Sequence, residues 1–339
     1  MAEYTIELNN LTKKFGDFTA VDDLSLTVKK GEIFGFLGPN GAGKSTTIRM
    51  LCTLAQPTSG SAKVAGYDIV KDSEKVRENI GLVAEKMIMY DRLTAAENLR
   101  FFGKLYDMPK QKLEKRIDEL LELVDMQKWK HTQIATFSTG MKQRINVIRA
   151  LLPEPKILFM DEPTLGLDPQ TTFSIRDITR KINESGVTVI LTTHAMVEAE
   201  ALSDRVAIID HGKVAALDTS QNLKNLISKS NVSIFGAKIT NLTPELIEKI
   251  NSLDVVVTVS QQDDHNLKIS ANGTDALNHI IDVIRHEGGN ISVITNSNES
   301  TLEDVFLAVT GKEIRDEASK KSSIAYYDPH ESAAKSRVR

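Results

Sequence analysis

The segment from Gly38 to Ser45 concentrates residue types that can bind a polyphosphate. It is GPNGAGKS, and it matches the pattern G-x-x-x-x-G-K-[ST]. Glycines let backbone N–H groups turn toward an anion, and the start of a following helix adds unpaired N–H donors and the positive end of its dipole. In this pattern Lys44 reaches the β- and γ-phosphates and the Ser45 hydroxyl holds Mg²⁺. The predicted nucleotide contacts are Gly38, Pro39, Asn40, Gly41, Ala42, Gly43, Lys44, Ser45 and Thr46.

The residues on either side of this loop predict a strand before it and a helix after it. Residues 32–38 are EIFGFLG, a short apolar run, and residues 45–54 are STTIRMLCTL. A strand, a glycine-rich loop and a helix in this order are the context that supports a nucleotide site. The alternative is a glycine-rich turn without a ligand, which the full match in this context disfavours.

A pair of acidic residues, Asp161 and Glu162, follows a second apolar run, ILFM. A strand that ends in a carboxylate can hold the Mg²⁺ ion that bridges nucleotide phosphates. We therefore predict Asp161 as a metal ligand beside Ser45, and Glu162 as the group that polarises an attacking water. Adjacent acids are also common on protein surfaces, but the apolar run before them and the earlier phosphate loop favour a site.

Apolar runs that alternate with helical patterns predict a mostly parallel α/β sheet. The strands are expected at residues 156–163, 187–194 and 205–217, with helices near 170–184 and 195–203 between them. Residues 4–28 predict two further strands joined by a turn at Gly16 and Asp17. Residues 93–152 have apolar residues at helical spacing and predict a helical insertion.

The segment FSTGMKQR, residues 137–144, points to a specific family. Over roughly residues 4–220, the chain resembles the nucleotide-binding subunit of an ABC transporter. That family has a serine–glycine signature at the start of a helix, and Ser138, Thr139, Gly140 and Met141 stand in its place. Other family marks occur in order: Phe15 where an aromatic ring stacks on adenine, Asp168 in the D-loop LGLD, and His194 as the switch histidine.

Two of these marks have plainer alternatives. A lone histidine after an apolar strand is more often structural than catalytic, and Phe15 could be a core residue of its strand. The family pattern favours a contact between His194 and the γ-phosphate, and stacking of the Phe15 ring on adenine.

The resemblance implies an ATPase that uses ATP and Mg²⁺, with Lys44, Glu162 and His194 as catalytic residues. It implies an α/β fold, a P-loop NTPase of ABC type at residues 1–225 with an inserted helical subdomain at about 93–152. In the family, the signature of one subunit closes on ATP bound to the phosphate loop of the other. A homodimer or a pair of ATPase subunits is therefore expected, together with a separate polytopic membrane permease subunit. The chain would be peripheral, on the cytoplasmic face of the cell membrane.

Glu85 stands at the Q-loop position, where the family usually has glutamine. Glutamine donates and accepts hydrogen bonds, whereas an ionised glutamate only accepts. We predict that Glu85 orders Mg²⁺ or its water. Glu85, Thr139 in the signature and the segment TLEDVFLAVTGKE at residues 301–313 resemble the branch of exporters for drugs, polysaccharides, lipids or ions.

Residues 231–310 predict a second, smaller α+β domain. Its expected order is strand, helix, two strands, helix and strand, which suggests a ferredoxin-like fold. Its role stays open among regulation, dimerisation and bracing of the ATPase. The tail at 312–339 is polar and mixed in charge, and it is predicted to be disordered.

Composition narrows the class of protein. The 339 residues are 41% hydrophobic and 26% charged, which suits about two soluble domains. The net charge of −4 gives no overall basic field, so no nucleic acid is expected as a partner. The single cysteine, Cys52, excludes an intramolecular disulfide and is predicted to lie in the core. We expect no signal peptide and no membrane-spanning run, so the pore would be a separate polypeptide.

Two alternative functions stay open. An importer ATPase could have a substrate-sensing domain at 231–310, and a soluble ABC ATPase could act on ribosomes or DNA. The export-type signature favours export, and a single ATPase unit without long coiled coils disfavours the soluble class. Four residues are expected to contact the permease, unless they are ordinary packing residues: Met87, Ile88, Met89 and Tyr90.

Overall fold

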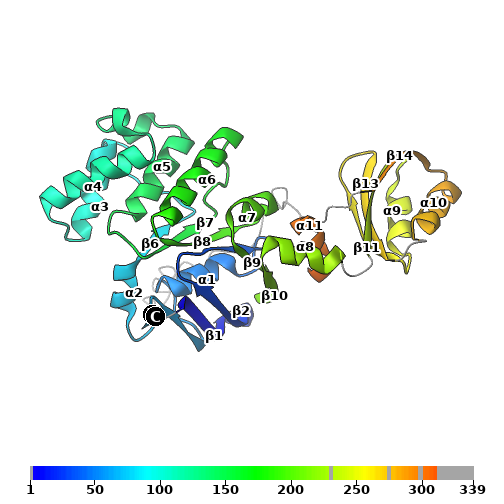
Figure 1. Ribbon diagram of the computed structural model, residues 1–339, viewed down its shortest axis with the longest axis horizontal. Helices are drawn as coiled ribbons and strands as arrows, with labels where there is room; N and C mark the ends of the chain where they lie inside the picture. Colours follow the sequence, from blue (N-terminus) through cyan, green and yellow to red (C-terminus); the bar gives the residue numbers. More distant parts are fainter. Residues whose placement is uncertain (1–2, 229–231, 273–275, 297–300, 311–339) are drawn as a thin grey trace, which may run out of the picture.

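We describe the protein from a computed structural model that covers residues 3–228, 232–272, 276–296 and 301–310 (Figure 1). The predicted tail at 312–339 lies outside the described residues. Figure 1 shows a larger body and a smaller unit built from β11 to β14, with helices α8 and α11 between them. No helix among the described residues has both the length and the apolar character needed to cross a membrane.

A six-stranded sheet forms the centre of the larger body, in the order β10-β9-β3-β8-β7-β6. All its neighbouring strands are parallel except β10, which pairs antiparallel with β9. The mostly parallel sheet predicted from the apolar runs is therefore confirmed. Its strands are β3 (Ile33–Leu37), β6 (Ile80–Val83), β7 (Ile157–Asp161), β8 (Thr188–Thr193), β9 (Arg205–Asp210) and β10 (Lys213–Asp218).

A four-stranded antiparallel sheet, in the order β2-β1-β4-β5, lies on one side of the central sheet. Its apolar residues share a core with helix α1 (Lys44–Leu51) and with one face of the central strands, where Phe34 and Phe159 are fully buried. Cys52 belongs to this core, as predicted. The strands are β1 (Tyr4–Phe15), β2 (Phe18–Lys29), β4 (Ser59–Val64) and β5 (Tyr67–Asp68), and α2 spans Ser73–Asn79.

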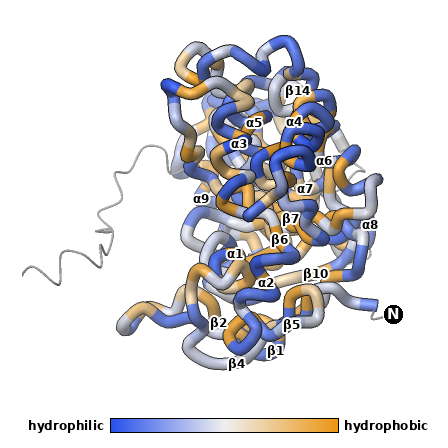
Figure 2. Tube along the Cα trace, turned by 90° about the vertical axis from the view of Figure 1, so that its left-hand side faces the viewer, coloured by the Kyte–Doolittle hydropathy of each residue, from blue (hydrophilic) through white to orange (hydrophobic). Residues whose placement is uncertain are grey.

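Helices cover the other face of the central sheet. Side chains alternate across a strand, so Leu158 and Met160 of β7 face these helices while Phe159 faces α1. Figure 2 shows hydrophobic residues along β6 and β7 and alternating hydrophilic and hydrophobic turns along α3 and α4. The helices are α3 (Ala95–Leu105), α4 (Lys110–Leu123), the short η1 (Gln127–Trp129) and η2 (Ile134–Thr136), α5 (Thr139–Ala150) and α6 (Pro169–Glu184). Helices α7 (Met196–Leu202) and α8 (Ser220–Ser228) follow in the chain.

The smaller unit has the βαββαβ order expected from the sequence. Its four strands form an antiparallel sheet in the order β12-β13-β11-β14. Buried residues such as Ile239, Ile269 and Ile280 form a separate hydrophobic core between this sheet and two helices. The elements are β11 (Val232–Thr240), α9 (Pro244–Asn251), β12 (Val256–Gln261), β13 (Asn266–Asn272), α10 (Ala276–His286) and β14 (Asn290–Asn296).

The last helix, α11 (Leu302–Thr310), packs with the larger body rather than in the core of the smaller unit. Phe306 shares a buried cluster with Ile208 of β9 and Leu223 of α8. The range 231–310 expected for the second domain includes α11. In the structure, however, this helix packs against the larger body. Asp304 of α11 is 2% exposed and lies 2.8 Å from Nζ of Lys268 on β13. This ion pair connects the two units.

Candidate functional site

The phosphate loop lies between β3 and α1, and two of its glycines are sterically required. A Cβ atom on Gly38 would lie 2.2 Å from the carbonyl oxygen of Ile209. Gly43 has a φ of +104°, and a Cβ there would lie 2.4 Å from the carbonyl oxygen of Ala20. Side chains at these positions would push the loop away from β2 and β9. The chain therefore brings bare backbone and the first turn of α1 to the same place.

Lys44 is a buried cation held by the loop itself. Its Nζ donates to the carbonyl oxygens of Gly38 at 2.7 Å and Pro39 at 3.2 Å, and it lies 3.4 Å from Oε1 of Glu162. Burial lowers the pKa of Lys44, and the nearby carboxylates, Glu162 first among them, oppose that change. An ammonium group in this position is available to an anion that enters the loop.

Strands β7 and β8 and the start of α1 bring a carboxylate and two hydroxyl groups together. Oδ1 of Asp161 accepts hydrogen bonds from Ser45 at 2.9 Å and from Thr192 at 2.6 Å. Hydroxyl and carboxylate oxygens are the ligands that Mg²⁺ prefers, so this donor set fits that ion. The described residues contain no cluster of three or more His, Cys, Asp or Glu side chains that could hold a metal by themselves. An ion here would therefore need further oxygen ligands besides these side chains.

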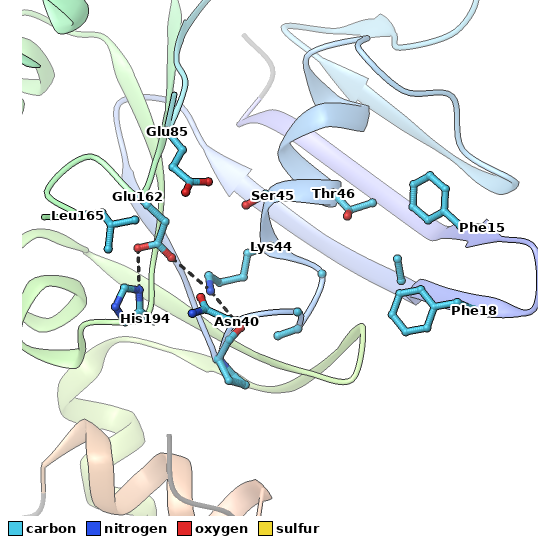
Figure 3. Close-up of a pocket in the computed structure, with 15 residues that line it drawn as sticks. Phe15, Phe18, Asn40, Lys44, Ser45, Thr46, Glu85, Glu162, Leu165 and His194 are labelled. Carbon is cyan, nitrogen blue, oxygen red and sulfur yellow. Dashed lines mark hydrogen bonds and ion pairs between the residues drawn. The ribbon is translucent and has the colours of Figure 1, made fainter. Parts of the chain in front are cut away.

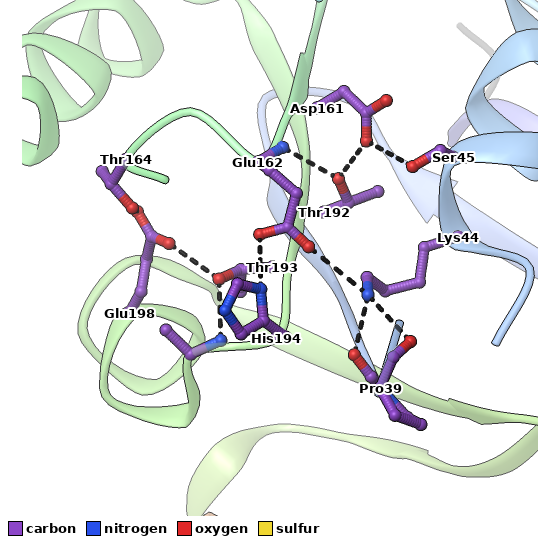
Figure 4. A network of polar contacts seen from close by, with 12 residues as sticks. Pro39, Lys44, Ser45, Asp161, Glu162, Thr164, Thr192, Thr193, His194 and Glu198 are labelled. Atoms are coloured by element: carbon purple, nitrogen blue, oxygen red, sulfur yellow. Dashed lines mark hydrogen bonds and ion pairs between the residues drawn. The ribbon is translucent and has the colours of Figure 1, made fainter. Parts of the chain in front are cut away.

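Glu162 and His194 form a contact pair in the same region (Figure 4). Oε2 of Glu162 lies 2.9 Å from Nδ1 of His194. The backbone of Glu162 has a φ of +47°, an uncommon value for a residue with a side chain, and its N–H donates to Oγ1 of Thr192 at 3.0 Å. Thr192 thus positions both acidic residues. Sequence reasoning missed this threonine. The run TTH, which ends at His194, was a signal for it.

The phosphate loop, Glu162 and His194 line a cavity of about 520 Å³, whereas Asp161 and Thr192 lie behind its wall (Figure 3). The carboxylates and His194 lie at one end of it and two phenylalanine rings at the other. Glu85 is exposed and lines the cavity near Lys44. The lining residues are Phe15, Phe18, Ala20, Pro39, Asn40, Gly41, Ala42, Gly43, Lys44, Ser45, Thr46, Glu85, Glu162, Leu165 and His194.

The aromatic end of the cavity is the tip of the β1–β2 hairpin. Phe15 and Phe18 are paired across the turn and are 55% and 63% exposed, so neither ring lies in the core. Nζ of Lys13 lies 5.0 Å from the centroid of the Phe15 ring. Sequence reasoning chose Phe15 and missed Phe18, although a phenylalanine directly after the two-residue turn predicts a cross-strand partner.

The signature residues and Asp168 of the D-loop lie away from this cavity. The Ser138 hydroxyl accepts from the N–H of Met141 at 3.3 Å and caps α5, while Ser138 and Thr139 are exposed. Asp168 caps α6 by accepting from the N–H of Thr171 at 2.9 Å. None of these residues lines the cavity, so the folded chain does not bring its own signature to its own phosphate loop.

Comparison of the sequence with known proteins gives a consistent result. The sequence profile of a family described as ABC transporter matches residues 21–165. The linearmycin resistance ATP-binding protein LnrL of Bacillus subtilis is 38% identical over 318 residues, which cover 92% of this chain and 100% of that protein. The daunorubicin/doxorubicin resistance ATP-binding protein DrrA of Streptomyces peucetius is 35% identical, over 94% of this chain and 96% of that protein.

Solved structures match the larger body. An ATP-binding subunit of an ABC transporter is 30% identical with a TM-score of 0.59, covering 66% of this chain and 92% of that one. The ATP-binding cassette MJ0796, solved as a dimer in a post-hydrolysis state with ADP and phosphate, is 29% identical with a TM-score of 0.57. That match covers 63% of this chain and 98% of the MJ0796 chain. From its phosphate loop, its sheet and relatives that match along their whole length, the chain belongs to the ATP-binding proteins of ABC transporters.

Proposed function

We propose that this protein hydrolyses ATP and thereby drives a drug exporter whose pore is a separate polytopic membrane permease. The observation that supports this most strongly is the cavity lined by the phosphate loop and the Glu162–His194 pair, where Ser45 also bonds to Asp161. The relatives named for resistance to linearmycin and to daunorubicin support drugs as the exported class.

In this proposal each end of the cavity binds one part of ATP. The Phe15 ring stacks on adenine, and the backbone N–H groups of residues 38–46 and Lys44 bind the phosphates. Ser45 and Asp161 hold Mg²⁺, and Glu85 orders the ion or its water. When bound, Mg²⁺ would supply positive charge that offsets the negative charge of the phosphates.

Glu162 and His194 act on the attacking water and the γ-phosphate. Glu162 accepts a proton from the water, because its carboxylate faces the cavity and is positioned by two neighbours, Thr192 and His194. In the structure Glu162 also pairs with Lys44. The negative charge of a bound triphosphate would compete for Lys44 and leave the Glu162 carboxylate free to accept that proton.

A dimer completes the site in this proposal. The exposed Ser138 and Thr139 lie at the start of a helix, where N–H groups favour phosphate. They lie away from the cavity of their own chain, so a second subunit can present them to the nucleotide. The dimeric form of MJ0796 supports this arrangement.

A hydrophobic surface on α3 and the loop before it suits the permease. Rings of Tyr90 and Phe101 have centroids 4.8 Å apart, and both rings are partly exposed. Ile88 and Leu105 are 62% and 65% exposed. Exposed apolar clusters of this kind mark interaction sites, and we assign this one to the membrane subunit at the cytoplasmic face of the membrane.

Affinity purification of the tagged chain from detergent-solubilised native membranes tests the transport assignment. The expected result is a stoichiometric polytopic membrane protein, which is lost when Ile88 and Leu105 are both changed to serine. Recovery with ribosomes or DNA, or with no membrane partner, would contradict the transport function. ATP hydrolysis is tested separately, by measuring turnover of the purified protein.

A further inference from the structure

We infer that Glu198, a buried carboxylate outside the nucleotide cavity, is a positioning residue that fixes Glu162 and His194 relative to one another. This inference rests on the proposed role of those two residues in ATP hydrolysis. Glu198 lies on α7, four residues after His194, and is 1% exposed. A carboxylate is rarely buried in this way unless its oxygen atoms have hydrogen-bond donors.

The two oxygen atoms of Glu198 bind two different segments of the chain. Oε1 accepts from the hydroxyl of Thr164 at 2.7 Å, and Oε2 accepts from the hydroxyl of Thr193 at 2.8 Å. Thr164 follows Glu162 by two residues, and Thr193 directly precedes His194. One carboxylate therefore joins the turn after β7 to the end of β8, beside each member of the pair (Figure 4).

The Thr193 side of this link extends to the backbone beyond the histidine. Oγ1 of Thr193 accepts from the N–H of Ala195 at 3.0 Å while its hydrogen is donated to Glu198. The residues on both sides of His194 are thereby held by one hydroxyl group. This fixes the direction in which the imidazole leaves the backbone.

The Thr164 side is supported from a second direction by the signature helix. Nε2 of Gln143, on α5, donates to the carbonyl oxygen of Pro163 at 2.6 Å, and this glutamine is 6% exposed. The turn from Pro163 to Thr164 is thus held between α5 and α7. Glu162 enters this turn with a positive φ, so the turn determines where its carboxylate points.

Glu198 can position Glu162 and His194 without itself contacting the nucleotide. Glu198 does not line the cavity, and it has no contact with the phosphate loop among the hydrogen bonds of the described residues. Loss of the link should therefore leave ATP affinity nearly unchanged and lower the rate of the chemical step. A displacement of a reacting group by about 1 Å can reduce a rate by about 100-fold.

Steady-state ATP hydrolysis by single variants of the full chain tests the inference. Thr164→Val and Thr193→Val remove one donor each and keep the side-chain shape. We expect kcat to fall at least about fivefold in each, with KM for ATP within about twofold. In the Glu198→Ala background either threonine change should have little further effect, because the link is already absent.

The matched control is Thr179→Val on α6. Thr179 is 1% exposed, as is Thr193, and its hydroxyl donates to the carbonyl oxygen of Ile175 at 2.8 Å, away from the site. We expect this variant to lose as much thermal stability as the two test variants and to keep its kcat. Glu198→Gln retains an acceptor and a donor for the two hydroxyls, and it should keep more activity than Glu198→Ala.

Three outcomes would overturn the inference. One is an unchanged kcat in the folded Thr164→Val and Thr193→Val proteins, and another is an increase in KM with kcat retained. The third is an equal loss of kcat in the Thr179→Val control. If the wild-type chain itself shows no ATP hydrolysis that depends on Lys44, the proposed function fails first, and the inference falls with it.

Discussion

At the scale of single residues, the site consists of charged groups that are paired with one another. Lys44 lies between the carbonyl oxygens of Gly38 and Pro39 and the carboxylate of Glu162. Burial lowers the pKa of Lys44, and the neighbouring carboxylates, Glu162 first among them, oppose that change. The negative charge of a triphosphate would attract the Lys44 ammonium group more strongly than Glu162 does. Its binding would therefore change the contacts of both Lys44 and Glu162.

The substitution Glu162→Gln should separate ATP binding from ATP hydrolysis. We expect turnover to fall by about 100-fold or more, because glutamine cannot accept a proton from the attacking water. The phosphate loop and Lys44 are untouched, so ATP should still bind and hold two subunits together. Turnover assays and light scattering with ATP check this.

The control for that experiment is Lys44→Ala, which should lose nucleotide binding and therefore the dimer as well. A Glu162→Gln protein that hydrolyses ATP at the wild-type rate and stays monomeric would show that another group activates the water.

Glu198 also makes a pH-dependent contribution to stability. Burial raises the pKa of its carboxyl group, an effect that the hydroxyls of Thr164 and Thr193 only partly oppose. As pH rises from the ordinary glutamate pKa toward the raised value, Glu198 loses its proton in the unfolded chain but keeps it in the folded chain. The free energy of unfolding of the wild type should therefore fall relative to that of Glu198→Gln across this window, and stay level above it.

Urea unfolding of both proteins at several values between about pH 4 and pH 8 measures this difference. The comparison removes the contributions of all other titrating groups. A difference that is constant with pH would mean that the carboxyl group has the same pKa in the folded and unfolded chains.

At the scale of elements, the hairpin of β1 and β2 serves two purposes. Its apolar residues complete the core under the phosphate loop, and its tip extends past the core to expose Phe15 and Phe18. Tight pairing of residues 15 and 18 leaves the two rings on the cavity side of the turn (Figure 3). The rigid strands therefore deliver aromatic surface to a place where solvent and ligand can reach it.

The substitution Phe15→Ala should weaken ATP binding without changing the chemical step. Loss of one stacking partner is worth about 1 kcal/mol, or about a fivefold increase in KM, with kcat retained at saturating ATP. Phe173→Ala is the matched control, because that ring is 64% exposed and does not line the cavity. Equal KM values for wild type and Phe15→Ala would remove Phe15 from the nucleotide site.

At the scale of the whole molecule, α11 connects the smaller unit to the ATPase body. Its apolar face packs beside β9 and α8, while Asp304 pairs with Lys268 of the smaller unit. Asp304 also accepts from the N–H and the hydroxyl of Thr301, so its charge has three donors. The pair is therefore a fixed connection and not a surface contact in exchange with solvent.

The substitution Lys268→Met should lower the free energy of unfolding by about 3 kcal/mol, because it leaves the buried Asp304 carboxylate without its cation. Denaturant unfolding measures the loss. Lys249→Met is the control, since Lys249 pairs with Glu287 on the exposed surface of the same unit. A loss no larger than that of the control would show that the connection contributes little to stability.

The sequence by itself determined the family and most of the fold. The pattern from Gly38 to Ser45 requires bare backbone at fixed positions, and the structure shows contacts at Gly38 and Gly43 that exclude any side chain. Apolar runs bounded by helices required a buried parallel sheet, because strands covered on both faces are apolar throughout. The roles assigned to the site residues remain predictions.

Only the tertiary structure decided which distant residues meet. Local patterns marked the positions of Thr192 and Phe18 but not the residues that they contact. Glu198 has no local pattern, since a glutamate in a helix is ordinary until its neighbours are known. The placement of α11 was also a tertiary result, because its amphipathic sequence requires a partner surface but does not say which one. Local spacing fixes the type of an element and the face that it buries, whereas packing between elements fixes what that face contacts.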